Sequence, residues 1–231
     1  MSAPTSTPRP LRGAIFDFGG VITEPIFRLA GDEDPVLLAL VGHFIQEAQA
    51  VYGETTVSHD LHLLEVGRLS EADFFTRLCA RFEADGGPSV DPIEARRMIF
   101  GRPLVACAEM VDAVSRVRGA GYRTAMLTNV ARDSSHLWES LIDVGQLFDV
   151  VVDSSVVGLR KPDPAIFQLT CERLGLRPEE CLFVDDIPSN VAGAAALGIE
   201  AILCRDPTTV AQQVIDRLLG HPVTAGVTPP G

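Results

Sequence analysis

The chain has 231 residues, of which 46% are hydrophobic and 22% are charged, a composition typical of one globular domain with an insertion or of two modest domains. Its formal net charge of −12, with 19 Lys and Arg against 31 Asp and Glu, argues against nucleic acid and anionic membrane surfaces as partners. The five cysteines lie far apart and lack CxxC or histidine-rich spacing, which argues against a zinc site and favours reduced thiols.

Both ends of the chain have compositions typical of disorder. Residues 1–11 are rich in Pro, Ser and Thr and lack the apolar centre of a signal peptide, and residues 221–231 combine Pro, Gly and Thr. No apolar run in the sequence approaches membrane-spanning length. We therefore expect a disordered leader, a disordered tail and a cytoplasmic protein without a membrane partner.

The first predicted element is a short buried strand over residues 14–18, within the sequence GAIFDFGGVITE. Asp17 stands at the end of the apolar run and a Gly-Gly pair follows, which is how a catalytic carboxylate is carried on a strand tip. Taken alone the pattern is weak, because Asp before Gly-Gly is also common in ordinary turns.

Residues 25–100 have helical rather than strand-like patterning. Ser70 and Asp73 form a capping-box pattern with a shortened acid at the start of one amphipathic run. The predicted helices lie at 35–53, 70–84 and 91–100. A helical insertion directly after the first strand predicts a small cap domain, placed between core segments 12–24 and 101–220.

From residue 104 onward the predicted strands alternate with helices. Helical spacing separates nearly continuous apolar runs, and these runs predict strands at 124–128, 148–153, 181–186 and 200–204. The pattern predicts an α/β fold with a doubly wound, Rossmann-like parallel sheet covered by helices on both faces. Left-handed helix C-caps are expected at Gly121, Gly145, Gly175 and Gly198.

Polar residues gather at or just beyond the predicted strand ends, where a doubly wound sheet binds its ligands. They are Asp17, Thr128, Asn129, Lys161, Asp185 and Asp186. Three carboxylates brought together would repel one another unless a cation neutralised them, and oxygen-only ligation selects a hard ion such as Mg²⁺. The lysine and the threonine hydroxyl add donors for a phosphoryl group, and Asp17 is suited to be the nucleophile that forms an aspartyl-phosphate.

In this order and at these strand ends, the motifs FDFGGV, LTN, RKPDPAIF and FVDDIPSNVAGAAALG resemble the four motifs of the haloacid dehalogenase superfamily of hydrolases. The resemblance spans roughly residues 12–205. The helical insertion is similar to the cap of a phosphatase-rich branch that includes sugar-1-phosphate phosphatases and the phosphatase domain of soluble epoxide hydrolase. The resemblance implies a Mg²⁺-dependent phosphatase that acts on a small phosphorylated metabolite.

The resemblance also implies a set of metal ligands. Asp17 would be both nucleophile and metal ligand, and Gly19 would bind the metal through its carbonyl oxygen. Asp186 would hold Mg²⁺ directly, and Asp185 would do so through water or would support the other ligands. Which of the paired acids touches the metal is left open.

The remaining motif residues are implied to handle the phosphoryl group. Thr128 would bind its oxygens, Asn129 would be positioned beside Thr128, and Lys161 would neutralise the nucleophile and the transferring group. Lys161 is the only lysine in the sequence. Its use at the core argues against phosphonate hydrolysis, which would need a Schiff-base lysine from the cap.

Gly19 departs from the family's pattern, in which an Asp at this position serves as general acid and then as general base. Such catalysis contributes about 10²–10⁴ in rate. We therefore expect a large loss for alkyl phosphates, whose leaving group needs a proton, and a mild loss for aryl or acyl phosphates. A substitute acid could come from Glu24, from the cap or from bound water.

Two other functions are weighed against the phosphatase. Gly19 favours a phosphate-ligand sensor or interaction protein that kept the fold and lost turnover. Haloacid dehalogenation needs no metal and is disfavoured, because the sequence keeps the paired acids Asp185 and Asp186. Monomer and homodimer are both left open.

Residues outside the motifs receive structural interpretations. His59 and His62 are interpreted as an exposed helical face. Several aromatic residues are expected in the core rather than in substrate stacking, namely Phe44, Phe74, Phe75, Phe82 and Trp138.

Overall fold

The computed structural model describes residues 10–25, 34–101, 103–132 and 136–220 of the chain. The predicted tail lies outside these ranges, and so does the predicted leader apart from residues 10 and 11. Among the described residues, no helix is long and apolar enough to cross a membrane. All five cysteines are buried free thiols.

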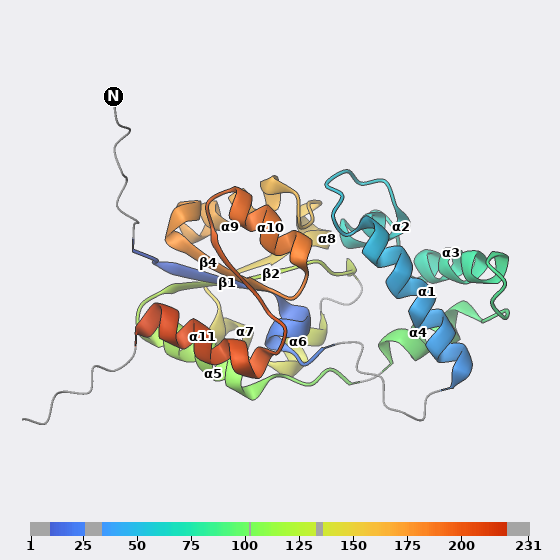
Figure 1. Ribbon diagram of the computed structural model, residues 1–231, viewed down its shortest axis with the longest axis horizontal. Helices are drawn as coiled ribbons and strands as arrows, with labels where there is room; N and C mark the ends of the chain where they lie inside the picture. The colour runs from blue at the N-terminus through green and yellow to red at the C-terminus, as the bar shows by residue number, and fades with distance from the viewer. Residues whose placement is uncertain (1–9, 26–33, 102, 133–135, 221–231) are drawn as a thin grey trace, which may run out of the picture.

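A five-stranded parallel sheet forms the centre of the larger part of the molecule (Figure 1). Its strands are β1 (Gly13–Phe16), β2 (Arg123–Thr128), β3 (Val150–Asp153), β4 (Cys181–Asp185) and β5 (Glu200–Leu203). They lie in the order β3-β2-β1-β4-β5, so the strand order reverses between β1 and β4. That reversal predicts a ligand-binding crevice at the carboxyl ends of these two central strands. The predicted doubly wound α/β fold is confirmed.

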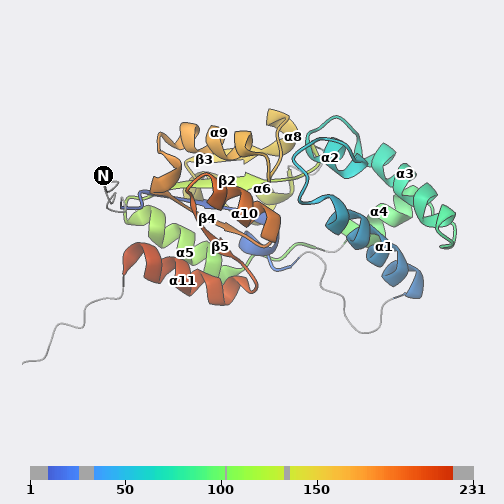
Figure 2. The same ribbon diagram turned by 45° about the horizontal axis from the view of Figure 1, so that its top comes forward.

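Helices cover both faces of the sheet (Figures 1 and 2). Alternate residues of β1 face opposite sides, with Phe16 in one apolar cluster and Ile15 in the other. The first face is covered by α5 (Ala108–Gly119), α6 (His136–Leu141), α7 (Val144–Leu147) and α11 (Pro207–Leu219). The second face is covered by α9 (Pro164–Leu174) and α10 (Pro188–Ala196). Short turns complete this part of the chain at η1 (Phe18–Ile22), α8 (Ser154–Val157) and η3 (Pro178–Glu180).

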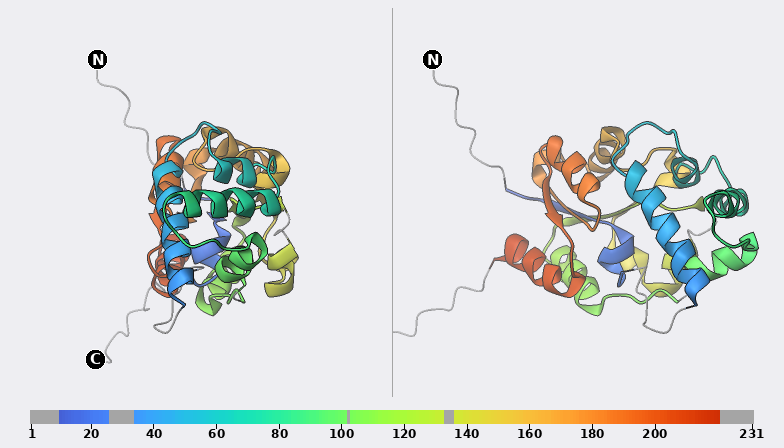
Figure 3. Two further views of the ribbon diagram at one scale, coloured as in Figure 1. Left: turned by 90° about the vertical axis from the view of Figure 1, so that its right-hand side faces the viewer. Right: turned by 45° about the vertical axis from the view of Figure 1, so that its right-hand side comes forward.

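Four further helices, called the cap below, lie beside the carboxyl ends of the strands (Figures 1 and 3). They are α1 (Pro35–Val51), α2 (Asp60–Glu65), α3 (Glu71–Ala84) and α4 (Pro92–Phe100). Their apolar side chains form a cluster of their own, and among the described residues of the sheet part Ala131 is the only buried one that belongs to it. The expected core aromatics are buried: Phe44, Phe74, Phe75 and Phe82 in the cap, and Trp138 in the cluster that also contains Phe16.

Local sequence explains where the cap helices begin. The Asp34 and Asp91 side chains accept hydrogen bonds from backbone N–H groups of the first turns of α1 and α4, and a proline follows each Asp. The Ser70 hydroxyl accepts from the Asp73 N–H at 3.1 Å and starts α3. These caps fix the helix starts, and burial of the apolar faces supplies most of the stability.

The structure differs from the sequence expectations at several points, including the strand predicted at 148–153, which begins only at Val150. β1 ends at Phe16 rather than at residue 18, because the chain turns into η1 after Asp17. Gly145 lies inside α7 instead of capping a helix, since the Asp143 side chain begins a new helical turn there. The short helices α2 and α8 carry too few periodic residues to be predicted.

The exposed helical face expected at His59 and His62 is wrong. His62 is fully buried, and its Nε2 lies 3.0 Å from the Val51 carbonyl oxygen while its Nδ1 accepts from the Ser58 N–H at 3.3 Å. His59 is the N-cap of α2, where its Nδ1 accepts from the Leu61 N–H. The pattern marked only apolar residues, so it could not find a histidine held by backbone groups.

Candidate active site

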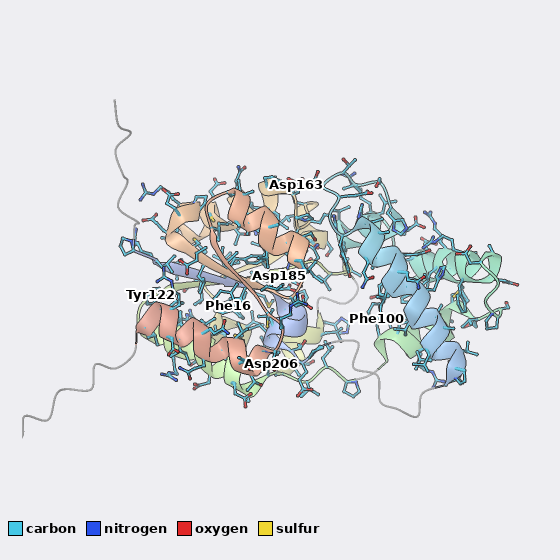
Figure 4. All side chains as sticks on the ribbon, in the orientation of Figure 1. Phe16, Phe100, Tyr122, Asp163, Asp185 and Asp206 are labelled. Carbon is cyan, nitrogen blue, oxygen red and sulfur yellow. The ribbon has the colours of Figure 1, made fainter. Side chains whose placement is uncertain are left out.

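Three carboxylates meet at the carboxyl ends of the central strands. Asp17 directly follows β1, Asp185 ends β4, and Asp186 comes next in the chain. Because β1 and β4 are parallel neighbours, their tips carry these residues to the same place, and one oxygen of each lies within 4.8 Å of the others. Figure 4 labels Asp185 at the end of the sheet that faces the cap. The structure therefore brings together the three acids selected from the sequence.

Lys161 forms ion pairs with two of these carboxylates, Asp17 and Asp185. Its Nζ lies 2.7 Å from Asp17 Oδ1 and 2.7 Å from Asp185 Oδ2, and it also donates to the Leu127 carbonyl at 2.9 Å. The side chain is only 1% exposed, so the ammonium group is held among these three acceptors. A single lysine thus faces three acids.

Because three acids surround one lysine, the pKa values of Asp17, Asp186 and Lys161 are shifted from their usual values. Burial, together with repulsion from Asp185 and Asp186, raises the pKa of Asp17 to about 8 against the attraction of Lys161. Burial and Asp185 raise the pKa of Asp186 to about 6. Burial alone would lower the pKa of Lys161, but Asp17 and Asp185 outweigh it and raise that pKa. The described protein groups leave the cluster with uncompensated negative charge.

The two paired acids differ in their hydrogen bonding. Asp185 is fully buried: its Oδ1 accepts from the Ile187 N–H at 2.8 Å and from Asn190 Nδ2 at 3.0 Å, while its Oδ2 accepts from Lys161. Asp186 is half-buried, and among the described residues no side chain donates a hydrogen bond to its carboxylate. Asp186 therefore has more free coordinating capacity than Asp185.

The loop after Asp17 passes close over Asp186. Gly20 has φ +69°, and a Cβ on it would lie 2.5 Å from Asp186 Oδ2, so only glycine fits this approach. The Gly20 N–H donates to the Thr23 hydroxyl at 3.2 Å, which holds the turn. Gly19 has φ −71° and ψ 127°, a conformation that any residue adopts.

The tip of β2 is tied to the loop that carries Lys161. Thr128, at the end of β2, is 3% exposed. The Asn129 side chain accepts from the Lys161 N–H at 2.9 Å and donates to the Lys161 carbonyl at 3.0 Å. Asn129 thus orients the backbone of the only lysine in the chain.

Several residues around the cluster were not selected from the sequence. Asn190 supports Asp185, while Arg160 and Glu65 form a buried ion pair with Arg160 Nε 2.6 Å from Glu65 Oε2. The signal for Glu65 was an acid inside the apolar run LLEV, and Arg160 directly precedes Lys161. Glu24, the substitute acid proposed from sequence, bonds through its backbone N–H to the Val105 carbonyl at 2.8 Å, and its role stays a prediction.

Comparison with known proteins identifies relatives of this site and fold. A family model described as haloacid dehalogenase-like hydrolase matches residues 11–198. The chain is 38% identical over 199 residues to a phosphatase of Mycobacterium tuberculosis, MT3486, covering 84% of this chain and 87% of that protein. It is 27% identical over 211 residues to Bifunctional epoxide hydrolase 2 of Sus scrofa, covering 88% of this chain but 38% of that protein.

Solved structures share the fold. A haloacid dehalogenase family enzyme of Bacteroides thetaiotaomicron, in complex with magnesium and inorganic phosphate, superimposes with a TM-score of 0.56 at 20% identity, covering 84% of this chain and 93% of that chain. Among relatives found by sequence, (S)-2-haloacid dehalogenase 1 of a Pseudomonas species is 21% identical over 201 residues, covering 84% of this chain and 84% of that protein. The chain spans well under half the length of several curated relatives, including 11% of Acyl-CoA dehydrogenase family member 10 of Mus musculus.

Proposed function

The chain belongs to the haloacid dehalogenase-like hydrolases, and from that premise we propose that it is a Mg²⁺-dependent phosphatase that hydrolyses a small phosphorylated metabolite through an aspartyl-phosphate at Asp17. The observation that carries the proposal is the cluster of Asp17, Asp185 and Asp186 around one buried lysine. Support comes from a relative that is a phosphatase and from a structural neighbour in complex with magnesium and inorganic phosphate.

The residues present fit a magnesium ion. Three carboxylates within 4.8 Å of one another offer oxygen ligands only, and the burial and mutual repulsion that raise the pKa values of Asp17 and Asp186 are what a bound cation would offset. Asp17, Asp186 and the Gly19 carbonyl would hold the ion, and Asp185, already bonded to protein donors, would support them. When bound, Mg²⁺ would neutralise charge on a phosphoryl oxygen.

Each residue of the site would have a separate role in phosphoryl transfer. An Asp17 carboxylate oxygen attacks phosphorus, the bond to the ester oxygen breaks, and the departing alcohol takes up a proton. Lys161, 2.7 Å from Asp17 Oδ1, favours the ionised form of the nucleophile and would neutralise charge on the transferring group, and Thr128 and Asn129 would orient the phosphoryl group. Water next attacks phosphorus of the aspartyl-phosphate, which releases inorganic phosphate and restores the carboxylate.

Proton transfer is the weak step of this scheme. Gly19 has no side chain to protonate the leaving oxygen, so substrates whose leaving groups are stable as anions should react best. Aryl and acyl phosphates belong to this class. The same glycine favours the second candidate, a protein that binds a phosphorylated ligand without turnover.

The test is release of inorganic phosphate from p-nitrophenyl phosphate with and without Mg²⁺. We expect Mg²⁺-dependent turnover by the wild type and a loss of at least about 10³-fold in Asp17→Asn, because the nucleophile is removed. Asp112→Asn, which changes an exposed Asp of α5, is the matched control and should retain full activity.

Two other outcomes would assign a different function to the protein. Binding of phosphate with Mg²⁺ but no turnover on aryl or acyl phosphates at any pH would favour the binding protein. Metal-independent halide release from a 2-haloacid, lost in Asp17→Asn, would show a dehalogenase. Either result contradicts the proposed phosphatase.

A further inference from the structure

The cap and the sheet part of the molecule meet through polar contacts close to Lys161. The Ser154 hydroxyl, at the start of α8, donates to the Glu65 carbonyl at 2.6 Å, and the Ser189 hydroxyl of α10 donates to the Tyr52 carbonyl at 3.2 Å. A Cβ on Gly67 would lie 2.4 Å from the Ser155 carbonyl oxygen, so the two backbones approach closely there. The cap is docked against the tips of β2 and β3.

Arg160 reaches from the loop before Lys161 into the cap. It is 1% exposed; its Nε donates to Glu65 Oε2 at 2.6 Å, and its Nη1 donates to the Glu54 carbonyl at 2.8 Å. Its Nη2 is buried and has no hydrogen-bond partner in the described part of the chain. Both partners of this buried cation belong to the cap, so its charge is balanced only while the cap is docked.

Glu65 also contacts Asn129, which holds the backbone of Lys161. Its Oε2 accepts from Asn129 Nδ2 at 3.5 Å, and Asn129 is the residue whose side chain holds both the N–H and the carbonyl of Lys161. The carboxylate is 7% exposed, and its pKa is raised by burial against the attraction of Arg160. Glu65 Oε2 therefore accepts both from Arg160, which directly precedes Lys161, and from Asn129, which holds the Lys161 backbone.

We infer that Glu65 is a positioning residue: through Arg160 and Asn129 it couples docking of the cap to placement of Lys161 against Asp17. The inference rests on the proposed phosphatase function. With the cap lifted, Arg160 loses both partners and Asn129 loses an acceptor, so two of the constraints on the loop that carries Lys161 are removed. The site is complete only when the cap has closed over the substrate.

The first experiment compares turnover of p-nitrophenyl phosphate by the wild type, Glu65→Gln and Glu94→Gln. Glu94 is the matched control, because it is also a cap glutamate paired with an arginine, Arg97, but lies exposed and within α4. We expect kcat of Glu65→Gln to fall by about 10- to 100-fold, since displacement of a catalytic group by about 1 Å costs that much. KM should change by less than about threefold, and Glu94→Gln should match the wild type.

A double variant keeps the test valid if Glu65→Gln folds poorly. Glu65→Gln with Arg160→Met removes both buried charges together, so it avoids an unpaired ion. Because the two residues act as one unit, the double variant should lose no more activity than either single variant, within about threefold. Losses that multiply would contradict the coupling.

Two further results would overturn the inference. A kcat of Glu65→Gln within twofold of the wild type would exclude a positioning role. A loss confined to alkyl phosphates, with aryl phosphates unaffected, would instead make Glu65 a proton carrier for the leaving group.

Amide hydrogen exchange separates this inference from the proposed function. In Glu65→Gln the Lys161 N–H, bonded to Asn129, should exchange at least about fivefold faster than in the wild type, and in Glu94→Gln it should be unchanged. If the wild type hydrolyses no phosphate ester, this measurement still tests the coupling. Unchanged exchange in Glu65→Gln would contradict it.

Discussion

The two adjacent glycines of the first loop occupy their positions for different physical reasons. Gly20 is required by shape, because its φ of +69° and its approach to Asp186 leave no room for a side chain. Gly19 is in an ordinary backbone conformation, so no local geometry demands glycine there. The fold would therefore accept a carboxylate at position 19, and its absence changes the chemistry of the site without being required by the backbone.

We predict that Gly19→Asp increases hydrolysis of alkyl phosphates. The backbone accepts the new residue, and the added carboxyl group can protonate the leaving oxygen, a contribution of about 10²-fold or more. The measurement is kcat/KM for an alkyl and an aryl phosphate, with Gly19→Ala as control. A gain of equal size on both substrates would show that the added group acts otherwise than by proton transfer.

Gly20→Ala should damage the metal site instead. The new methyl group would collide with the Asp186 carboxylate, and alanine would be strained at positive φ, at a cost of about 1–3 kcal/mol in the free energy of unfolding. Titration calorimetry with Mg²⁺ should show binding weakened at least about tenfold. Gly19→Ala is again the matched control, and equal Mg²⁺ affinity in the two alanine variants would contradict this account.

At the scale of elements, the sequence predicted those features that depend on a local residue pattern, namely the strands and the polar residues that follow them. Apolar runs located all five strands, and the residues after them placed Asp17, Asp185 and Asp186 at one edge. The partnership of Glu65 with Arg160 could not be predicted, since it joins residues 95 positions apart across the cap boundary. His62 was missed for the same reason, because its burial depends on how α2 packs.

The burial of His62 beside Arg160 predicts a pH-dependent stability. Desolvation and the Arg160 charge lower the pKa of His62 below 6.5, against an opposing effect of the hydrogen bond to the Val51 carbonyl; His59 adds a smaller lowering and Glu54 a smaller opposing effect. The unfolded chain therefore binds the proton more readily than the folded one. The resulting stability is present above pH 6.5 and is lost as the pH falls from there toward the lowered pKa of the folded state.

Thermal unfolding between pH 7.5 and 5.5 measures this effect. The wild type should lose stability over that range relative to His62→Gln, which has no titrating ring. The exposed His136→Gln is the control and should follow the wild type. Identical pH profiles for the wild type and His62→Gln would show that His62 carries no such linkage.

At the scale of the whole molecule, the apolar core of the cap and that of the sheet part, which has one cluster on each face of the sheet, meet at a polar boundary. Of the described residues in the sheet part, Ala131 is the only buried one in the cap cluster, and the contacts near Lys161 are hydrogen bonds and an ion pair. Opening such a boundary exposes groups that water can solvate, so it costs less than separating an apolar interface. The fold thus allows the cap to move while both cores stay intact.

The active-site cluster should lower the stability of the whole protein until its ligands bind. Mutual repulsion of these three carboxylates, two buried and one half-buried, opposes folding, so metal-free Asp186→Asn should melt at a higher temperature than the metal-free wild type near pH 7.5. Mg²⁺ with inorganic phosphate at about 100 times the dissociation constant should stabilise the wild type by about 2.7 kcal/mol, which is roughly 5–10 °C for a chain of this size. The variant lacks a metal ligand and should gain little. The difference in melting temperature between Asp186→Asn and the wild type should therefore shrink or change sign when the ligands are added. An equal rise in the melting temperatures of both proteins would mean that Asp186 does not hold the metal.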